Sequence, residues 1–284
     1  MIQSNNMSEN LPEMLSFTKA LALEAGALIK QMRDSGELTR TTKSGTDVLT
    51  SADIASEKLI ISKIKERFPT HSILSEESAS SLSSNADFLK PLWIIDPIDG
   101  TRNYAHNHPH CAVSIAWSQG GETKVGVVHT PFANETFYAT KSGGAFLNDK
   151  PIASRSITEL KDTLACTGFA HRDRKLKRYM EIAQLVLTNC AEIRRLGAAS
   201  LDICWVACGR LDAFYETLNP WDYAAANLVA REAGAITGHI GEIPADLAIP
   251  IEFYSEEILV ACKGVFDKFR EMLRSAPKDA GRHF

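Results

Sequence analysis

Short apolar runs and stretches with apolar residues at helical spacing alternate along the chain. Apolar residues three and four positions apart predict amphipathic helices, and short runs of apolar and β-branched residues between turn signals predict strands. Helices are predicted at residues 11–32, from within 47–53 to 68, and at 178–187, 201–207, 219–234 and 265–273. Strands are predicted within residues 69–75 and at 92–95, 111–117, 125–130, 135–140, 164–167, 211–217, 235–237 and 258–262. This mixture predicts an α/β (α+β) protein whose central strands form a largely antiparallel sheet.

The most informative stretch reads Trp93-Ile-Ile-Asp-Pro-Ile-Asp-Gly-Thr101. Its apolar run predicts a buried strand that stops at Asp96, because Pro97 lacks an N–H group for a strand ladder and disfavours helical geometry in the preceding residue. The chain is therefore expected to turn at Pro97. Thr101 is expected to cap a short helix and to offer a hydroxyl group.

Two carboxylates, Asp96 and Asp99, stand three residues apart at this strand end. Such a pair suits a hard divalent cation, and the Ile98 carbonyl between them adds an oxygen ligand. Gly100 leaves the backbone bare, so the turn presents N–H groups to a phosphate beside the metal. An ordinary strand, turn and helix with Asp-Gly as turn chemistry fits the same local pattern.

Three further acids, Asp53, Glu76 and Asp222, stand at the edges of apolar elements where the backbone direction is fixed. Each also has a structural interpretation. Ser51 or Asp53 fits the N-cap of a helix, and paired glutamates are usually solvated charge. Asp222 falls in the first turn of a predicted helix, where an acid is favourable because of the helix dipole.

If the fold gathers these five acids, cations are needed to hold them together. Two unit charges about 4 Å apart repel by roughly 4 kcal/mol at an effective dielectric constant of about 20. No histidine or cysteine accompanies the acids at zinc-like spacing, and ligation by oxygen alone favours Mg²⁺, with Mn²⁺ as a substitute. Adjacent divalent ions supply what phosphate-ester hydrolysis requires, which predicts a metal-dependent phosphatase.

Composition narrows the class of protein. The chain has 284 residues, 44% of them hydrophobic, and a net charge of -4, which gives no general attraction to nucleic acid or to an anionic membrane. No apolar run is long enough to span a membrane. The six cysteines lack zinc-type pairing, and a reducing cytoplasm is the simplest context. Residues 1–10 are expected to be a flexible tail, and residues 11–284 a single phosphatase domain.

The chain resembles the inositol monophosphatase family, within the wider lithium-sensitive, metal-dependent phosphatase superfamily that includes fructose-1,6-bisphosphatases. Four blocks carry the resemblance in family order, and it covers nearly the whole chain after the tail. They are Asp47-Val-Leu-Thr-Ser-Ala-Asp53, Glu76-Glu-Ser78, Trp93-Ile-Ile-Asp-Pro-Ile-Asp-Gly-Thr101, and Trp221-Asp-Tyr-Ala-Ala-Ala with Glu232-Ala-Gly234. The resemblance implies a layered αβαβα sandwich, a homodimer, and inhibition by lithium.

The resemblance also implies a role for each matching residue. Two or three Mg²⁺ ions would be held by Glu76, Asp96, the Ile98 carbonyl, Asp99 and Asp222, with Glu76 and water forming the weaker third site. Thr101 paired with Asp53 would orient the attacking water, and the N–H groups of Gly100 and Thr101 would bind phosphate. Lys43 and Glu77 would lie next to these groups and contact them without binding metal or substrate themselves. Substrate hydroxyls would meet Asp99, Gly197, Ala198, Ala199, Glu216 and Asp222.

The substrate stays open at this point. Arg102 replaces the more usual threonine after Asp-Gly-Thr, and His171 and Arg172 occupy a stretch that the resemblance turns toward substrate. A small phosphorylated molecule such as myo-inositol 1-phosphate is expected, with histidinol phosphate, fructose 1,6-bisphosphate and 3′-phosphoadenosine 5′-phosphate as alternatives. The alternative outside the enzymes is a regulatory protein. It would bind RNA or transcription machinery through the basic run at residues 172–178.

Overall fold

The computed structural model describes residues 10–36, 39–42, 48–78, 87–169 and 176–277. Nearly all of the predicted tail, Lys43 and most of the basic run at residues 172–178 lie outside these ranges. The assignment of residues 11–284 to one domain stays a prediction. Among the described residues, no helix is long and apolar enough to cross a membrane.

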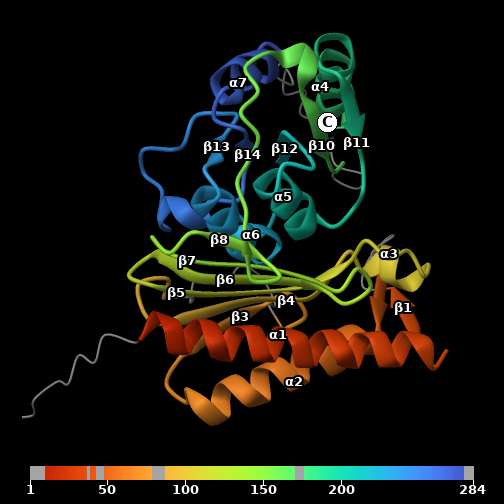
Figure 1. Ribbon diagram of the computed structural model, residues 1–284, viewed down its shortest axis with the longest axis vertical. Helices are drawn as coiled ribbons and strands as arrows, with labels where there is room; N and C mark the ends of the chain where they lie inside the picture. The colour runs from red at the N-terminus through yellow and green to blue at the C-terminus, as the bar shows by residue number, and fades with distance from the viewer. Residues whose placement is uncertain (1–9, 37–38, 43–47, 79–86, 170–175, 278–284) are drawn as a thin grey trace, which may run out of the picture.

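Five layers stack along the long axis of the molecule (Figure 1). One outer layer holds α1 (Leu11–Asp34) and α2 (Ser51–Arg67), and the middle layer holds α5 (Ala199–Ala207) and α6 (Pro220–Glu232). The other outer layer holds α4 (Leu176–Asn189) and α7 (Phe266–Arg274). A seven-stranded sheet and a five-stranded sheet separate these helical layers. The arrangement confirms the predicted αβαβα sandwich.

The seven-stranded sheet has the order β3-β4-β5-β6-β7-β8-β9. Its strands are β3 (Ser72–Ser75), β4 (Leu92–Asp99), β5 (Ala112–Gln119), β6 (Glu122–Thr130), β7 (Glu135–Thr140), β8 (Ala145–Leu147) and β9 (Lys150–Pro151). Only β3 and β4 pair in parallel, so the predicted antiparallel character is confirmed. Trp93 and Ile95 pack toward α1 and α2, whereas Ile94 between them packs toward the middle helices. This alternation lets β4 serve two cores.

The five-stranded sheet has the order β11-β10-β12-β14-β13. Its strands are β10 (Leu164–Thr167), β11 (Glu192–Arg194), β12 (Ala213–Glu216), β13 (Ile236–His239) and β14 (Ile258–Ala261). Tyr215 and Leu259 join the core under α4 and α7, and Phe214 and Val260 join the core of the middle helices. Two short 3₁₀ helices complete this half, η1 (Leu160–Asp162) and η2 (Ile251–Phe253).

A small hairpin precedes α2. It pairs β1 (Arg40–Thr42) with β2 (Val48–Thr50), in a region that the sequence predicted as polar turn and helix opening. Strands of three residues carry too little periodicity to be recognised from a pattern. The helix therefore begins at Ser51, and its N-cap is Thr50 rather than Ser51 or Asp53.

The strand β4 also differs from its prediction. It continues through Asp96 and Pro97 to Asp99, with a register shift against β5 between the two aspartates. An irregular ladder tolerates a proline because the missing N–H is not needed there. Thr101 opens the short helix α3 (Thr101–Ala105) but does not cap it, since the N-cap is Gly100 with a left-handed φ of 85°.

Candidate functional site

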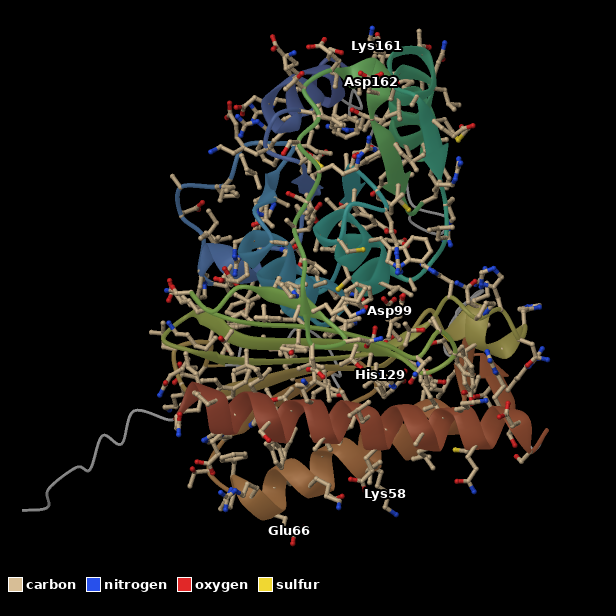
Figure 2. All side chains as sticks on the ribbon, in the orientation of Figure 1. Lys58, Glu66, Asp99, His129, Lys161 and Asp162 are labelled. Carbon is tan, nitrogen blue, oxygen red and sulfur yellow. The ribbon has the colours of Figure 1, made fainter. Side chains whose placement is uncertain are left out.

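The parallel pairing of β3 with β4 brings two acidic motifs to the same edge of the seven-stranded sheet. Ser75 lies opposite Ile95 in this pair, and the Glu76 N–H donates to the Ile95 carbonyl at 3.1 Å. Glu76 and Asp96 therefore leave their strands side by side. Figure 2 places Asp99 where this sheet meets the helices of the middle layer.

Asp99 is held by the start of α5. Its carboxylate accepts hydrogen bonds from the N–H groups of Ala199, at 3.1 Å, and Ser200, at 2.7 Å. The Ser200 hydroxyl donates to the same carboxylate at 2.6 Å. A helix N-terminus carries unpaired N–H groups and a positive dipole end, so it stabilises this buried anion.

Asp222 occupies the first turn of α6. Its carboxylate accepts a hydrogen bond from the Asn219 N–H at 2.8 Å. This capping hydrogen bond adds to the favourable interaction with the helix dipole that the sequence predicted for an acid at this position. Because α5 and α6 both begin beside β4, their N-termini fix Asp99 and Asp222 at the same site.

Asp53 and Thr101 form a pair that joins α2 to α3. One carboxylate oxygen of Asp53 accepts from the Thr50 N–H at 2.7 Å and from the Thr50 hydroxyl at 2.6 Å, which completes the helix start. The other lies 3.0 Å from the Thr101 hydroxyl, which is also 3.0 Å from the Ile98 carbonyl oxygen. Asp53 is fully buried, so its position is fixed by the fold.

A cleft of about 270 Å³ opens over these groups. The predicted site residues that line it are Glu76, Asp99, Gly100, Thr101, Gly197, Ala199, Glu216 and Asp222. The others do not line it: Asp53, Asp96, Ile98 and Ala198 are buried in the surrounding structure. Glu77 follows Glu76 in the turn after β3, and Lys43 lies outside the described residues. Which of these residues touch metal or substrate stays a prediction.

The carboxyl groups of the site act on one another. Burial, followed by the charges of Glu76, Asp99 and Asp222, raises the pKa of Asp96. Burial likewise raises the pKa of Asp222, and Glu76 and Asp99 add to the effect. Burial raises the pKa of Asp99 to about 6 against the opposing effect of its Ser200 hydrogen bonds. The site therefore favours bound protons or cations over free negative charge.

The ligand types of this site are carboxylate and carbonyl oxygens, which suit hard divalent ions. Within the described ranges, no group of three or more histidine, cysteine, aspartate or glutamate side chains stands in a ready-made metal-binding arrangement. The Asp99 and Asp222 carboxylates instead accept helix N–H groups. A carboxylate has about four lone-pair sites, so these hydrogen bonds leave room for a metal ion on the same groups.

Several residues of the site were missed by the sequence prediction. Arg195 and Asp202 line the cleft, and Arg195 opposes the burial that raises the pKa of Glu216. Asp202 and His110 are both buried. A carboxylate oxygen of Asp202 lies 2.7 Å from Nε2 of His110. The Asn103 amide donates to the carbonyls of His110 and Leu196 at 2.7 and 2.8 Å, respectively, and so ties α3 to the turn before α5. The lone acid in the apolar stretch at residues 199–207 was the one signal for Asp202.

We expect Glu216→Gln to stabilise the metal-free protein increasingly as pH rises. Burial raises the pKa of Glu216 to about 8, whereas an unfolded chain has an ordinary value of about 4.3. Between these values the folded state binds more protons than the unfolded state, so the wild-type free energy of unfolding falls as pH rises. The glutamine variant lacks this contribution.

Urea unfolding in EDTA at about pH 5 and about pH 9 measures the effect. The free energy of unfolding of the variant minus that of wild type should be at least about 1 kcal/mol larger at the higher pH than at the lower one. An equal difference at both pH values would contradict the raised pKa.

The chain is similar to known proteins over most of its length. Residues 10–267 match the inositol monophosphatase family. The chain is 38% identical over 226 residues to the protein named Nus factor SuhB of Escherichia coli strain K12, covering 78% of this chain and 84% of that protein. It is similar to the structure of extragenic suppressor protein suhB from Bartonella henselae, with 29% identity, a TM-score of 0.84, and coverage of 93% of this chain and 100% of that one. The structure of inositol monophosphatase from Anabaena (Nostoc) is 32% identical, with a TM-score of 0.77 and coverage of 94% and 98%, respectively.

Proposed function

The chain belongs to the inositol monophosphatase family, and we propose from this premise that it catalyses the Mg²⁺-dependent hydrolysis of a small phosphomonoester. The observation that carries the proposal is the convergence of Glu76, Asp96, Asp99 and Asp222, where burial and then the neighbouring charges raise the pKa values of Asp96 and Asp222. Divalent cations bound among these acids would offset the negative charge and would supply a binding site for a phosphate group.

The oxygen donors of the site fit Mg²⁺, with Mn²⁺ as a substitute. Three positions are assigned by the resemblance. Glu76, Asp96 and the Ile98 carbonyl would hold the first ion, and Asp96, Asp99 and Asp222 the second, while Glu76 with water would form a weaker third site. When bound, the ions supply a Lewis acid that neutralises the phosphoryl group, activates water and steadies the leaving oxygen.

The residues of the chain position the reactants. The Thr101 hydroxyl, 3.0 Å from the Asp53 carboxylate, would orient the attacking water, since Asp53 fixes the direction of the hydroxyl proton. The N–H groups of Gly100 and Thr101, at the start of α3, would donate hydrogen bonds to the phosphate oxygens. Glu216, which lines the cleft with Asp99 and Asp222, would accept hydrogen bonds from substrate hydroxyls. Gly197 and Ala199 would form the wall beside them.

A polyol phosphate fits this wall best, and myo-inositol 1-phosphate is the substrate that we propose. Two acidic groups, Asp202 and Glu216, face a cleft that also contains Arg195. Carboxylates accept hydrogen bonds from several hydroxyl groups at once. Histidinol phosphate is the nearest alternative because the same acids would pair with its ammonium group. We also propose that the protein is a homodimer in the cytoplasm and that lithium inhibits it.

Phosphate release from a substrate panel tests this proposal. The panel contains myo-inositol 1-phosphate, histidinol phosphate, fructose 1,6-bisphosphate and 3′-phosphoadenosine 5′-phosphate, each assayed with Mg²⁺ and with EDTA. We expect turnover of at least one ester that is lost in EDTA and restored by excess Mg²⁺, with inositol phosphate preferred. Full activity in EDTA would overturn the metal-dependent mechanism, and preference for another ester would change only the substrate.

The name Nus factor SuhB of the curated relatives favours a second candidate function, association with the transcription machinery. Within the basic run, Arg178 is largely buried in an ion pair with Glu257 at 2.7 Å, whereas Lys177 is exposed. Binding to RNA with a steep salt dependence, weakened by Arg174→Gln and Lys177→Gln, would support this function. Phosphatase activity of the same variants would show whether the two functions coexist.

A further inference from the structure

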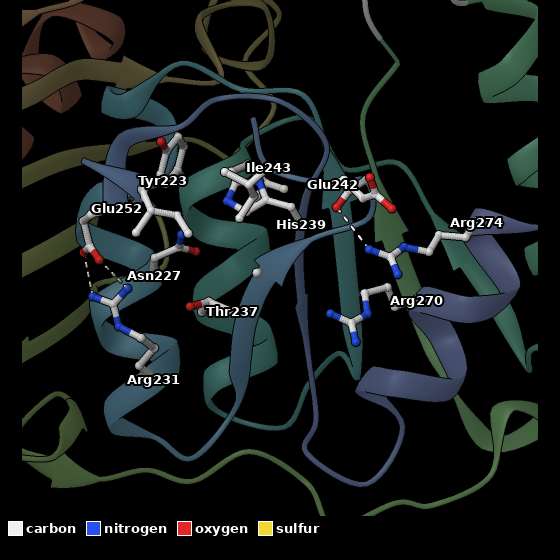
Figure 3. Close-up of a pocket in the computed structure, with 14 residues that line it drawn as sticks. Tyr223, Asn227, Arg231, Thr237, His239, Glu242, Ile243, Glu252, Arg270 and Arg274 are labelled. Atoms are coloured by element: carbon white, nitrogen blue, oxygen red, sulfur yellow. Dashed lines mark hydrogen bonds and ion pairs between the residues drawn. The ribbon is translucent and has the colours of Figure 1, made fainter. Parts of the chain in front are cut away.

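A cavity of about 600 Å³ lies apart from the cleft and shares no lining residue with it. Figure 3 shows its walls, which come from α6, β13, η2, α7 and the chain after β13. This volume is within the range of about 300–1,000 Å³ that small-molecule sites occupy. The family resemblance and the proposed phosphatase reaction assign nothing to it.

One wall is a face of α6. Tyr223, Asn227 and Arg231 line the cavity at intervals of four residues, so they follow one another along the helix. Asn227 is only 7% exposed, and its carbonyl oxygen has no hydrogen-bond partner in the described part of the chain. In Figure 3 its amide points toward the space between Thr237 and His239. A buried acceptor without a partner costs stability, which a ligand donor would recover.

The opposite wall is cationic. Arg270 and Arg274 project from α7 (Figure 3). Arg274 donates to the carbonyls of Ile240 and Gly241, and within the described residues it forms no ion pair with a carboxylate. The carboxylate partner of Arg270 is Asp267 at 3.0 Å, whose side chain is 81% exposed. A pair this exposed contributes little, so the Arg270 guanidinium is available to an anion. Arg274 keeps the N–H groups that the carbonyls of Ile240 and Gly241 do not occupy.

The remaining lining limits the charge of the occupant. Arg231 is neutralised by a two-pronged ion pair with Glu252, at 3.0 and 2.7 Å. Glu242 also lines the cavity, so the anionic group should carry a single charge. Ile243, Ile251 and Ile258 supply apolar surface.

We propose that this cavity binds a small monocarboxylate with an apolar body and a hydroxyl or amino group. The carboxylate would accept charge-assisted hydrogen bonds from Arg270 and from the remaining N–H groups of Arg274. The hydroxyl or amino group would donate to the Asn227 carbonyl oxygen. The apolar body would lie against the isoleucines. The cavity is thus a second ligand site, independent of the phosphatase cleft.

Two probes that differ by one hydroxyl group test the proposal. Titration calorimetry with 3-phenyllactate and 3-phenylpropionate uses the full chain in EDTA, where the acidic cleft repels both anions. We expect phenyllactate to bind about tenfold more tightly, because only its hydroxyl satisfies the Asn227 acceptor. Equal affinities, or no saturable binding of either probe, would overturn the proposal without any variant being made.

Three variants assign the contacts. Arg270→Gln and Arg274→Gln should each weaken both probes about tenfold, since each removes a charge-assisted hydrogen bond. Asn227→Leu should abolish the preference for phenyllactate while leaving the affinity of phenylpropionate unchanged. Arg67→Gln, an exposed arginine of α2 in the opposite outer layer, should bind as wild type. Wild-type affinity in both Arg270→Gln and Arg274→Gln would place the probes elsewhere.

Discussion

Asp96→Asn should lower phosphate release by at least about a hundredfold to a thousandfold while leaving the protein folded. The substitution removes a carboxylate that the proposal assigns to two metal ions. The Ile98 N–H donates to Asp96 at 3.0 Å, and an asparagine carbonyl oxygen preserves that hydrogen bond. The loss should therefore come from metal binding and not from a rearranged strand end. Phosphate release at saturating inositol phosphate across a Mg²⁺ titration measures it.

Stability separates this result from a folding defect. Burial and the charges of Glu76, Asp99 and Asp222 raise the pKa of Asp96, so its ionised form is unfavourable in the metal-free protein. Asp96→Asn should therefore unfold at the same temperature as wild type in EDTA, or at a higher one. Asp162→Asn, in the exposed 3₁₀ helix η1, is the matched control and should leave activity unchanged. Wild-type turnover in Asp96→Asn would refute the assignment.

Thr101→Val should lower turnover by about 10²-fold to 10⁴-fold, the range of effects seen when a group that handles a proton is removed. Valine keeps the shape of the side chain but loses the hydroxyl that lies 3.0 Å from Asp53. Thr101→Ser keeps the hydroxyl and should retain most of the activity. Steady-state kinetics should show the loss in kcat, since the substitution leaves the phosphate-binding N–H groups in place.

The pair of variants distinguishes a chemical role from a structural one. If Thr101 only stabilised the start of α3, the valine and serine variants would differ from wild type in melting temperature, and both would keep the wild-type kcat. Mg²⁺ affinity should be the same in both variants, because the assigned metal ligands are untouched. Equal kcat values for Thr101→Val and wild type would remove the Asp53 and Thr101 pair from the mechanism.

The long elements were predictable from their hydrophobic pattern because they repeat it, whereas the layered arrangement was implied by the family resemblance. The helix predicted at residues 11–32 is α1, and the strand predicted at 135–140 coincides with β7. Short elements were not predictable. The hairpin of β1 and β2 depends on pairing between three-residue strands, and the left-handed Gly100 cap follows from the close packing around it. A Cβ at Gly100 would lie 3.1 Å from the Gly197 carbonyl oxygen.

The acids of the site were found because each one stands at an edge of an apolar element, and apolar patterns reveal where elements begin and end. Their supports escaped notice because they depend on tertiary contacts. Ser200 donates to Asp99, 101 positions earlier in the chain, and Asn103 reaches the turn before α5. A serine or asparagine in a sequence gives no sign of such a distant partner. Arg195 was missed for the same reason, since its effect on Glu216 exists only in the folded chain.

Anomalous diffraction from crystals soaked in Mn²⁺ tests the central claim most directly, because it locates the ions without an assay. We expect anomalous density among the carboxylates of Glu76, Asp96, Asp99 and Asp222, and its loss in Asp96→Asn crystals. A cleft without anomalous density at saturating Mn²⁺, in crystals whose protein is active in solution, would contradict the proposal that these acids hold the catalytic metal.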